Sequence, residues 1–155
     1  GGESIVDTTS LGPTRDPVGL ARIARATGLN IIMGGSYYID SLHPTEVDGL
    51  SEDDLVERIV REVTEGTDGT GIKPGVIGEI GCTWPLTDNE RKTLRASARA
   101  QRITGAPLHI HPGRDEKAPS QVLDILNAAG ADLSNAIMSQ KVNVGIGYAR
   151  LKRIT

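Results

Sequence analysis

The sequence predicts an α/β fold built on a parallel sheet, and three observations support this. Short apolar runs alternate with longer amphipathic segments, and most of the amphipathic segments start at a capping residue and stop at a glycine. Such alternation predicts parallel strands joined by helical crossovers. Two architectures fit, an open doubly wound sheet or part of a (β/α)₈ barrel. Polar residues at the ends of strands (Asp7, Tyr38, Glu79 and His111) favour the barrel, which carries its active site at that face.

Five apolar runs are the expected strands. They cover residues 4–8, 29–35, 76–81 and 107–111, and a fifth strand starts within 135–139. The third run contains β-branched residues and follows a loop with glycine and proline, which indicates a buried strand. The first run ends in a polar exit whose side chains can bond the backbone or a ligand.

The first expected helix has signals at both ends. Asp16 is a suitable N-cap, Pro17 fits the first helical position, and Gly28 is a terminator. Leu20 and Ile23, together with Ala24, are spaced to form one apolar face. These signals predict a helix from about residue 17 to residue 27.

Three further helices are expected between the later strands. Ser51 with Asp54, and Thr87 with Glu90, have the spacing of capping boxes, and these helices stop at Gly66 and Gly105. In the first of them, residues 55, 59 and 63 repeat at helical spacing. A last helix is expected over about 119–129, closed by a glycine at position 130.

Composition narrows the function classes. The 155 residues suit one domain with an adequate core, and the formal charge of −3 comes from mixed acidic and basic residues without a basic stripe. This pattern argues against nucleic acid and anionic membranes as partners. The single cysteine, Cys82, cannot form an internal disulfide, and no N-terminal apolar run resembles a signal peptide or membrane span, so we expect a cytoplasmic protein. No Gly-x-Gly-x-x-Gly or Walker A motif supports nucleotide binding.

Glu79 is the residue most in need of a partner. It lies inside an apolar strand with a glycine nearby on each side, and a buried carboxylate is costly unless an ionic or hydrogen-bonding group meets it. His111 ends the next strand, and neighbouring strands lie about 4.8 Å apart, so both side chains can reach one metal ion. The alternatives are a Lys or Arg partner for Glu79, and a core histidine bonded to a backbone carbonyl for His111.

Other residues have two interpretations each. His109 shares a strand face with His111 but lies one layer deeper, which favours a filler over a ligand. Cys82 would be either a nucleophile or metal ligand, or a small buried or turn residue, and the lack of a histidine near it in sequence favours the second. Arg114 follows Pro-Gly in a strand exit and would either bind a substrate anion or be solvated. Tyr37 and Tyr38 would either wall a pocket or pack the loop.

Several sequence runs resemble one known family. Residues 76–92 read Val-Ile-Gly-Glu-Ile-Gly-Cys-Thr-Trp-Pro-Leu-Thr-Asp-Asn-Glu-Arg-Lys, residues 110–114 read Ile-His-Pro-Gly-Arg, and residues 128–133 read Ala-Gly-Ala-Asp-Leu-Ser. Shorter matches lie at 14–17, 27–34 and 37–40. Together these runs resemble the phosphotriesterase-related proteins of the amidohydrolase superfamily over residues 1–139.

The resemblance implies a metal-dependent hydrolase with a (β/α)₈ TIM barrel, of which this chain would be about strands 2 to 6. Two divalent metals, usually zinc (Zn2+), would bridge a hydroxide that attacks an ester, an amide or a phosphorus centre in a small molecule. Glu79 matches the metal-bridging ligand, which is a carboxylated lysine in true phosphotriesterases, and His111 matches the fifth-strand histidine. Tyr38 matches a pocket aromatic, and Arg114 could meet the sulfonate of an N-acyl taurine.

The chain also departs from this pattern. The family's first strand, with a metal-binding His-x-His, would lie before Gly1, and Gln140 stands where a ligand histidine is expected. We therefore expect a partial hydrolase domain over residues 1–139 and a divergent tail over 140–155. With two of the expected ligands, the chain alone should bind zinc weakly and show no hydrolysis.

A different class of function stays open at this point. In that interpretation the chain is a non-catalytic α/β remnant or binding domain, and Glu79 and His111 serve only its structure. A flavodoxin-like phosphate-binding domain is a third alternative, which the absence of a glycine-rich first turn disfavours.

Overall fold

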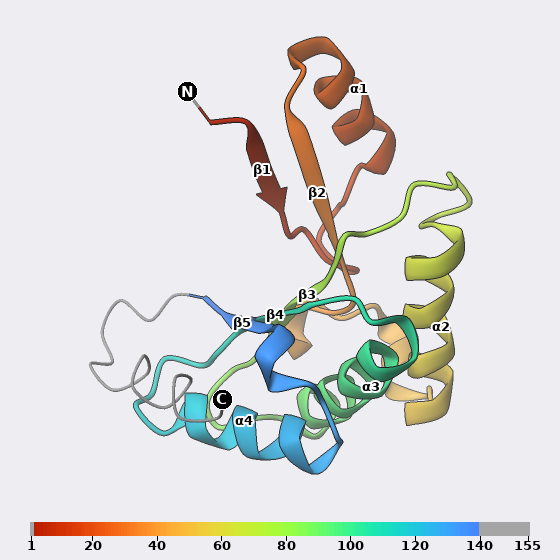
Figure 1. The fold of residues 1–155 in the computed structure, drawn as a ribbon. Helices are drawn as coiled ribbons and strands as arrows, with labels where there is room; N and C mark the ends of the chain where they lie inside the picture. The colour runs from red at the N-terminus through yellow and green to blue at the C-terminus, as the bar shows by residue number, and fades with distance from the viewer. Residues whose placement is uncertain (1, 140–155) are drawn as a thin grey trace.

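The computed structural model describes residues 2–139, which form a five-stranded parallel sheet with helices on its outer side (Figure 1). The strands pair in chain order from β1 to β5. Their bounds are β1 (Ser4–Asp7), β2 (Asn30–Gly35), β3 (Val76–Gly81), β4 (Leu108–His111) and β5 (Ala136–Met138). A doubly wound sheet reverses its strand order at a switch point, whereas a barrel keeps chain order throughout. The fold is therefore a partial TIM barrel, as the residue pattern and the resemblance predict.

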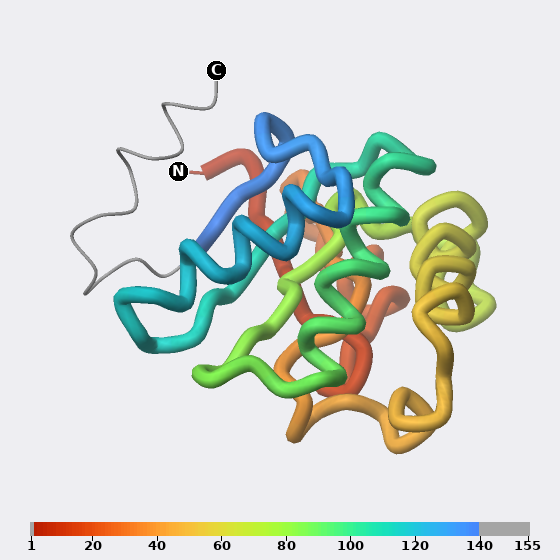
Figure 2. The backbone as a smooth tube through the Cα atoms, turned by 90° about the horizontal axis from the view of Figure 1, so that it is seen from below, coloured from red at the N-terminus to blue at the C-terminus, as the bar shows by residue number. Residues whose placement is uncertain are grey.

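Four α-helices connect the strands: α1 (Pro17–Thr27), α2 (Glu52–Glu65), α3 (Asp88–Thr104) and α4 (Ala118–Ala128). Viewed as in Figure 2, α2, α3 and α4 follow one another across the same side of the strands. Three 3₁₀ turns, η1 (Asp40–Leu42), η2 (Thr45–Asp48) and η3 (Leu133–Asn135), complete the connections. Within residues 2–139, none of the helices combines the length and the apolar character that a membrane crossing requires.

The helix starts follow the predicted caps. The Asp16 side chain accepts from the Gly19 amide, and both capping boxes are closed, from Ser51 to Asp54 and from Thr87 to Glu90. The predicted apolar face of α1 is partly wrong, because Ile23 is 46% exposed while the start of the helix is buried. The last helix also ends one residue early, at a cap formed by Ala129.

The hydrophobic core lies between the sheet and the helices. Side chains alternate along a strand, so Leu108 and Ile110 of β4 are buried in this core while His109 and His111 occupy the opposite face. The same face of β3 contributes Ile77 and Ile80 to the core. The core is completed by aliphatic side chains of the helices: Leu55, Ile59, Leu94, Val122 and Leu126. On β3 and β4, the inner, barrel-facing side of the sheet therefore carries the polar side chains of Glu79, His109 and His111.

Apolar side chains on the outer strands of the sheet are open to solvent. β1 and β5 are the outer strands, and among the described residues each pairs on one side only. Ile5 and Val6 on β1 and Ile137 on β5 are 48%, 54% and 60% exposed. Exposed apolar residues along open edges are what the partial barrel predicts.

Candidate active site

The ends of β3 and β4 bring Glu79 and His111 together. The carboxylate Oε2 of Glu79 lies 3.4 Å from Nδ1 of His111, and its Oε1 lies 3.9 Å from Nε2 of His109. Both histidines face the carboxylate because residues two apart on a strand point to the same side. The predicted juxtaposition of Glu79 and His111 is present in the structure.

The backbone before Glu79 depends on glycine. Gly78 has φ of 142°, and a Cβ atom there would lie 2.1 Å from the carbonyl oxygen of His109. At this point the register between β3 and β4 shifts between Ile77 and Ile80. An L side chain at position 78 would meet both strain and overlap, so the glycine permits the close approach of β4 that brings the histidines to Glu79.

Hydroxyl groups and histidines surround the Glu79 carboxylate. Ser139 Oγ donates to Oε1 at 2.6 Å, and Ser10 Oγ donates to the backbone carbonyl of Glu79 at 2.8 Å. Within the described part of the chain, no Lys or Arg forms an ion pair with Glu79. The alternative in which a basic side chain neutralises Glu79 is therefore wrong for these residues.

The surroundings keep Glu79 ionised. The contact with His111 lowers the pKa of Glu79, burial opposes this, and the hydrogen bond from Ser139 lowers it further, so the net shift is downward. Burial lowers the pKa of His109, which outweighs the opposing effect of Glu79. The site therefore offers an anionic oxygen with two imidazole rings beside it, and carboxylate oxygens and imidazole nitrogens are suitable donors for a divalent metal.

His111 contacts side chains, and none of the described backbone carbonyls accepts a hydrogen bond from it. Its Nδ1 lies 3.5 Å from the Tyr38 hydroxyl, and the two rings meet edge to face with centroids 5.4 Å apart. The interpretation as a core histidine satisfied by a carbonyl does not hold. The Nδ1 atom points toward the polar centre of the site.

The two tyrosines have different surroundings. Tyr37 is fully buried in the core, so it packs the loop. Tyr38 lines an open pocket of about 390 Å³ with Glu79 and the polar exit of β1, residues 7–10. Burial raises the pKa of Tyr38, the charge of Glu79 raises it too, and nearby Arg114 lowers it. Tyr38 thus lies between the carboxylate and a cation, on the wall of the pocket.

Backbone contacts fix the loop that carries Tyr38. The amide of Gly81 donates to the carbonyl of Tyr37 at 3.1 Å, which ties the loop to the end of β3. His43 Nε2 donates to the carbonyl of Tyr38 at 2.7 Å. Arg114 is exposed, forms no ion pair with any described residue, and is near enough to Tyr38 for its charge to act on that hydroxyl.

Cys82 is not part of this chemistry. Its side chain is 2% exposed within the core, and burial raises the pKa of its thiol. A buried neutral thiol is neither a good nucleophile nor a metal ligand. The prediction of a small buried residue is confirmed.

The described residues include side chains of the types that bind metal ions, but too few of them for a complete metal site. Glu79 and His111 supply an oxygen and a nitrogen donor, yet residues 2–139 hold no group of three His, Cys, Asp or Glu side chains arranged for a metal ion. A catalytic zinc site uses three protein ligands. The position of Gln140, where a further ligand was considered, lies outside the described residues.

Sequence reasoning did not assign the two serines that bond Glu79. Ser139 follows β5 and Ser10 follows β1, so each comes from the polar exit of a different strand. The available signal was their position after strands of a parallel sheet, where side chains converge. Serine is also common at such exits because it bonds the nearby backbone, so its presence alone did not indicate a contact with Glu79.

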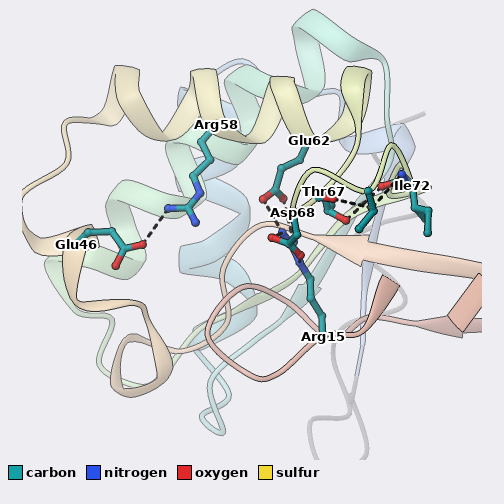
Figure 3. Close-up of polar contacts among 8 residues, drawn as sticks. Arg15, Glu46, Arg58, Glu62, Thr67, Asp68 and Ile72 are labelled. Atoms are coloured by element: carbon teal, nitrogen blue, oxygen red, sulfur yellow. Dashed lines mark hydrogen bonds and ion pairs between the residues drawn. The ribbon is translucent and has the colours of Figure 1, made fainter. Parts of the chain in front are cut away.

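A larger pocket of about 770 Å³ lies along α2, away from the Glu79 site. Four of the charged side chains that line it form ion pairs (Figure 3). Arg15, in the loop after β1, donates to Glu62 of α2 at 2.7 Å and to Asp68 at 2.9 Å. Arg58 of α2 donates to Glu46 of η2 at 3.2 Å. We interpret these pairs as structural, because they join α2 to neighbouring segments.

Comparisons with known proteins agree with this geometry. The model of the phosphotriesterase family matches residues 1–148. A phosphotriesterase-related protein of Nematostella vectensis is 51% identical over 139 residues, which are 90% of this chain and 40% of that protein. The N-acetyltaurine hydrolase of Homo sapiens is 48% identical over 139 residues, which are likewise 90% of this chain and 40% of that protein. The chain therefore spans about 40% of the length of these curated relatives.

Among solved structures, a resiniferatoxin-binding protein from Rhodobacter sphaeroides superimposes with a TM-score of 0.85 at 47% identity. The match covers 89% of this chain and 38% of that protein. Similarity in sequence and in strand arrangement thus extends over nearly all of the described residues.

Proposed function

The chain belongs to the phosphotriesterase family, and from this premise we propose that it is the part of a metal-dependent hydrolase that carries Glu79 and His111. The reaction is hydrolysis of a small-molecule ester or amide. One observation carries the proposal, namely that an ionised carboxylate and a histidine from adjacent strands meet at 3.4 Å without a Lys or Arg partner among the described residues. A purely structural carboxylate would be expected to have such a partner.

The metal proposed for the site is Zn2+. Glu79 and His111 would hold it, and a bound zinc ion lowers the pKa of water toward 7, which provides a nucleophile at neutral pH. The residues of the chain have separate tasks. Glu79 supplies negative charge, His111 supplies a nitrogen donor, and Tyr38 excludes water on one wall of the pocket.

The proposed substrate is an amide with an anionic end, of the N-acyl taurine type. The curated relative from Homo sapiens is named for the hydrolysis of N-acetyltaurine. Arg114 is exposed, has no ion-pair partner in the described part of the chain, and lies close enough to Tyr38 to lower its pKa. A guanidinium in this position is suited to a sulfonate or carboxylate group.

A domain exchange tests this proposal. The 139-residue matching segment of the Homo sapiens relative is replaced by the corresponding segment of this chain, and N-acetyltaurine hydrolysis is measured with added zinc. We expect turnover, and we expect Glu79→Gln in the exchanged segment to abolish it. The matched control is Glu57→Gln, an exposed carboxylate on α2. A folded hybrid that turns over equally with Glu79→Gln would overturn the proposal.

The second candidate is a non-catalytic domain, favoured by the presence of only two candidate metal ligands among residues 2–139. Zinc titration of the 155-residue chain separates the two functions. We expect weak, saturable zinc binding that Glu79→Ala removes, and no hydrolysis by the chain alone. Zinc binding that is absent, or that persists without Glu79, supports the non-catalytic alternative.

A further inference from the structure

Two serines hold Glu79 at separate points. The Ser10 hydroxyl binds its backbone carbonyl at 2.8 Å, and the Glu79 amide donates to the carbonyl of Thr8 at 3.1 Å, so the main chain is tied to the exit of β1. The carboxylate itself is bound by Ser139 from the exit of β5, at 2.6 Å. The residue is therefore held from the exits of both outer strands of the sheet.

The Ser139 hydroxyl has one proton and two acceptors within reach. These are Oε1 of Glu79 at 2.6 Å and the carbonyl of Ile110 at 3.1 Å. The Ile110 carbonyl already accepts from the Ser139 amide at 2.8 Å, whereas the ionised carboxylate is the stronger acceptor. The hydroxyl proton therefore goes to Glu79.

We propose that Ser139 is a positioning residue that orients the Glu79 carboxylate for metal binding. Its hydrogen bond engages Oε1 and leaves Oε2 facing His111 at 3.4 Å. A carboxylate held in one orientation loses less freedom when it binds a cation. This inference rests on the proposed function, and loss of such an outer-shell partner typically costs about 10- to 100-fold in metal affinity.

The hydrogen bond is tested first without metal, by a double-mutant cycle in urea unfolding of the 155-residue chain. The variants are Ser139→Ala, Glu79→Ala and the double variant. We expect Ser139→Ala to raise the unfolding equilibrium constant about 10-fold, as for a hydrogen bond to a charged group, and to have little effect once Glu79 is replaced by alanine. Ser139→Thr keeps a hydroxyl and should restore the wild-type value. Ser41→Ala, at an exposed serine, is the control.

The consequence is then tested by titrating the same proteins with zinc chloride. We expect Ser139→Ala to weaken zinc binding about 10-fold or more, and the Ser139→Thr variant to bind zinc about as tightly as the wild type. Zinc affinity unchanged in Ser139→Ala, or a cycle without coupling to Glu79, overturns the positioning role. Coupling in the cycle together with no zinc binding by wild type overturns the proposed function instead, while the hydrogen bond stands.

Discussion

The Glu79 carboxylate and the His111 imidazole meet at 3.4 Å across adjacent strands. Each of them also contacts a residue from another part of the chain. Ser139 binds the carboxylate, and the Tyr38 hydroxyl lies 3.5 Å from the imidazole. The pair is therefore part of a polar cluster on the barrel-facing side, separated by the strands from the aliphatic core. No Lys or Arg of the described residues belongs to this cluster, so hydrogen bonds and the imidazole rings alone offset the cost of burying the Glu79 carboxylate.

The first prediction concerns the two ligands. We expect His111→Ala to weaken zinc binding by the chain more than the roughly 10- to 100-fold that loss of an outer-shell partner costs, because a donor atom is removed. Competition with a chromophoric chelator measures the affinity. His109→Ala is the comparison, since its Nε2 is 3.9 Å from Glu79. A larger loss for His109 than for His111 would show that the ligand is assigned to the wrong histidine.

The second prediction concerns Gly78, whose alanine variant would place Cβ 2.1 Å from the His109 carbonyl. The control is Gly28→Ala at the end of α1, where φ is 73° and no atom lies within 4 Å of the added Cβ. We expect the control to cost about 1–2 kcal/mol of unfolding free energy, from backbone conformation alone. Gly78→Ala should cost clearly more, as urea unfolding would measure. Equal costs would mean that β4 moves aside freely.

The third prediction concerns the buried ion pair between the loop after β1 and α2. The side chains of Arg15 and Glu62 are 4% and 8% exposed, so removing Glu62 leaves the buried guanidinium of Arg15 with only the half-exposed Asp68 as a partner. We expect Glu62→Ala to destabilise the chain by about 3–5 kcal/mol in urea unfolding. Glu46→Ala breaks an exposed pair with Arg58 and should have a much smaller effect on stability. Similar losses for both variants would contradict the role of burial.

The sequence predicts the parts of this fold that depend on local chemistry. Residues within one helical turn predict the helix caps at Asp16, Ser51 and Thr87. A short run of apolar residues predicts the strand over 76–81. The exposure of Ile23 could not be foreseen, because helical spacing gives a face but not what covers it. Polar strand ends favoured the barrel over a doubly wound sheet, and the strand order of the structure confirms this choice.

The two central residues of the candidate site could be predicted from the sequence, but their hydrogen-bond partners could not. Glu79 and His111 were found because a carboxylate in an apolar strand is costly and the next strand ends in histidine. The roles of Ser10 and Ser139 depend on contacts between strand exits far apart in sequence, and serine itself carries little signal. The ion pair between Arg15 and Glu62 was also not predicted, because its partners are far apart in sequence.

The last prediction concerns Arg114 and the charge of the substrate. In the exchanged hybrid, we expect Arg114→Ala to raise KM for N-acetyltaurine about 10-fold, the equivalent of one hydrogen bond to a charged group, with kcat little changed. The reason is that an exposed guanidinium near Tyr38 would bind the anionic end in the ground and transition states alike. Arg25→Ala, an exposed arginine on α1, is the control. A fall in kcat with unchanged KM would show that Arg114 acts on the reacting group, and an unchanged KM with unchanged kcat would remove it from the substrate site.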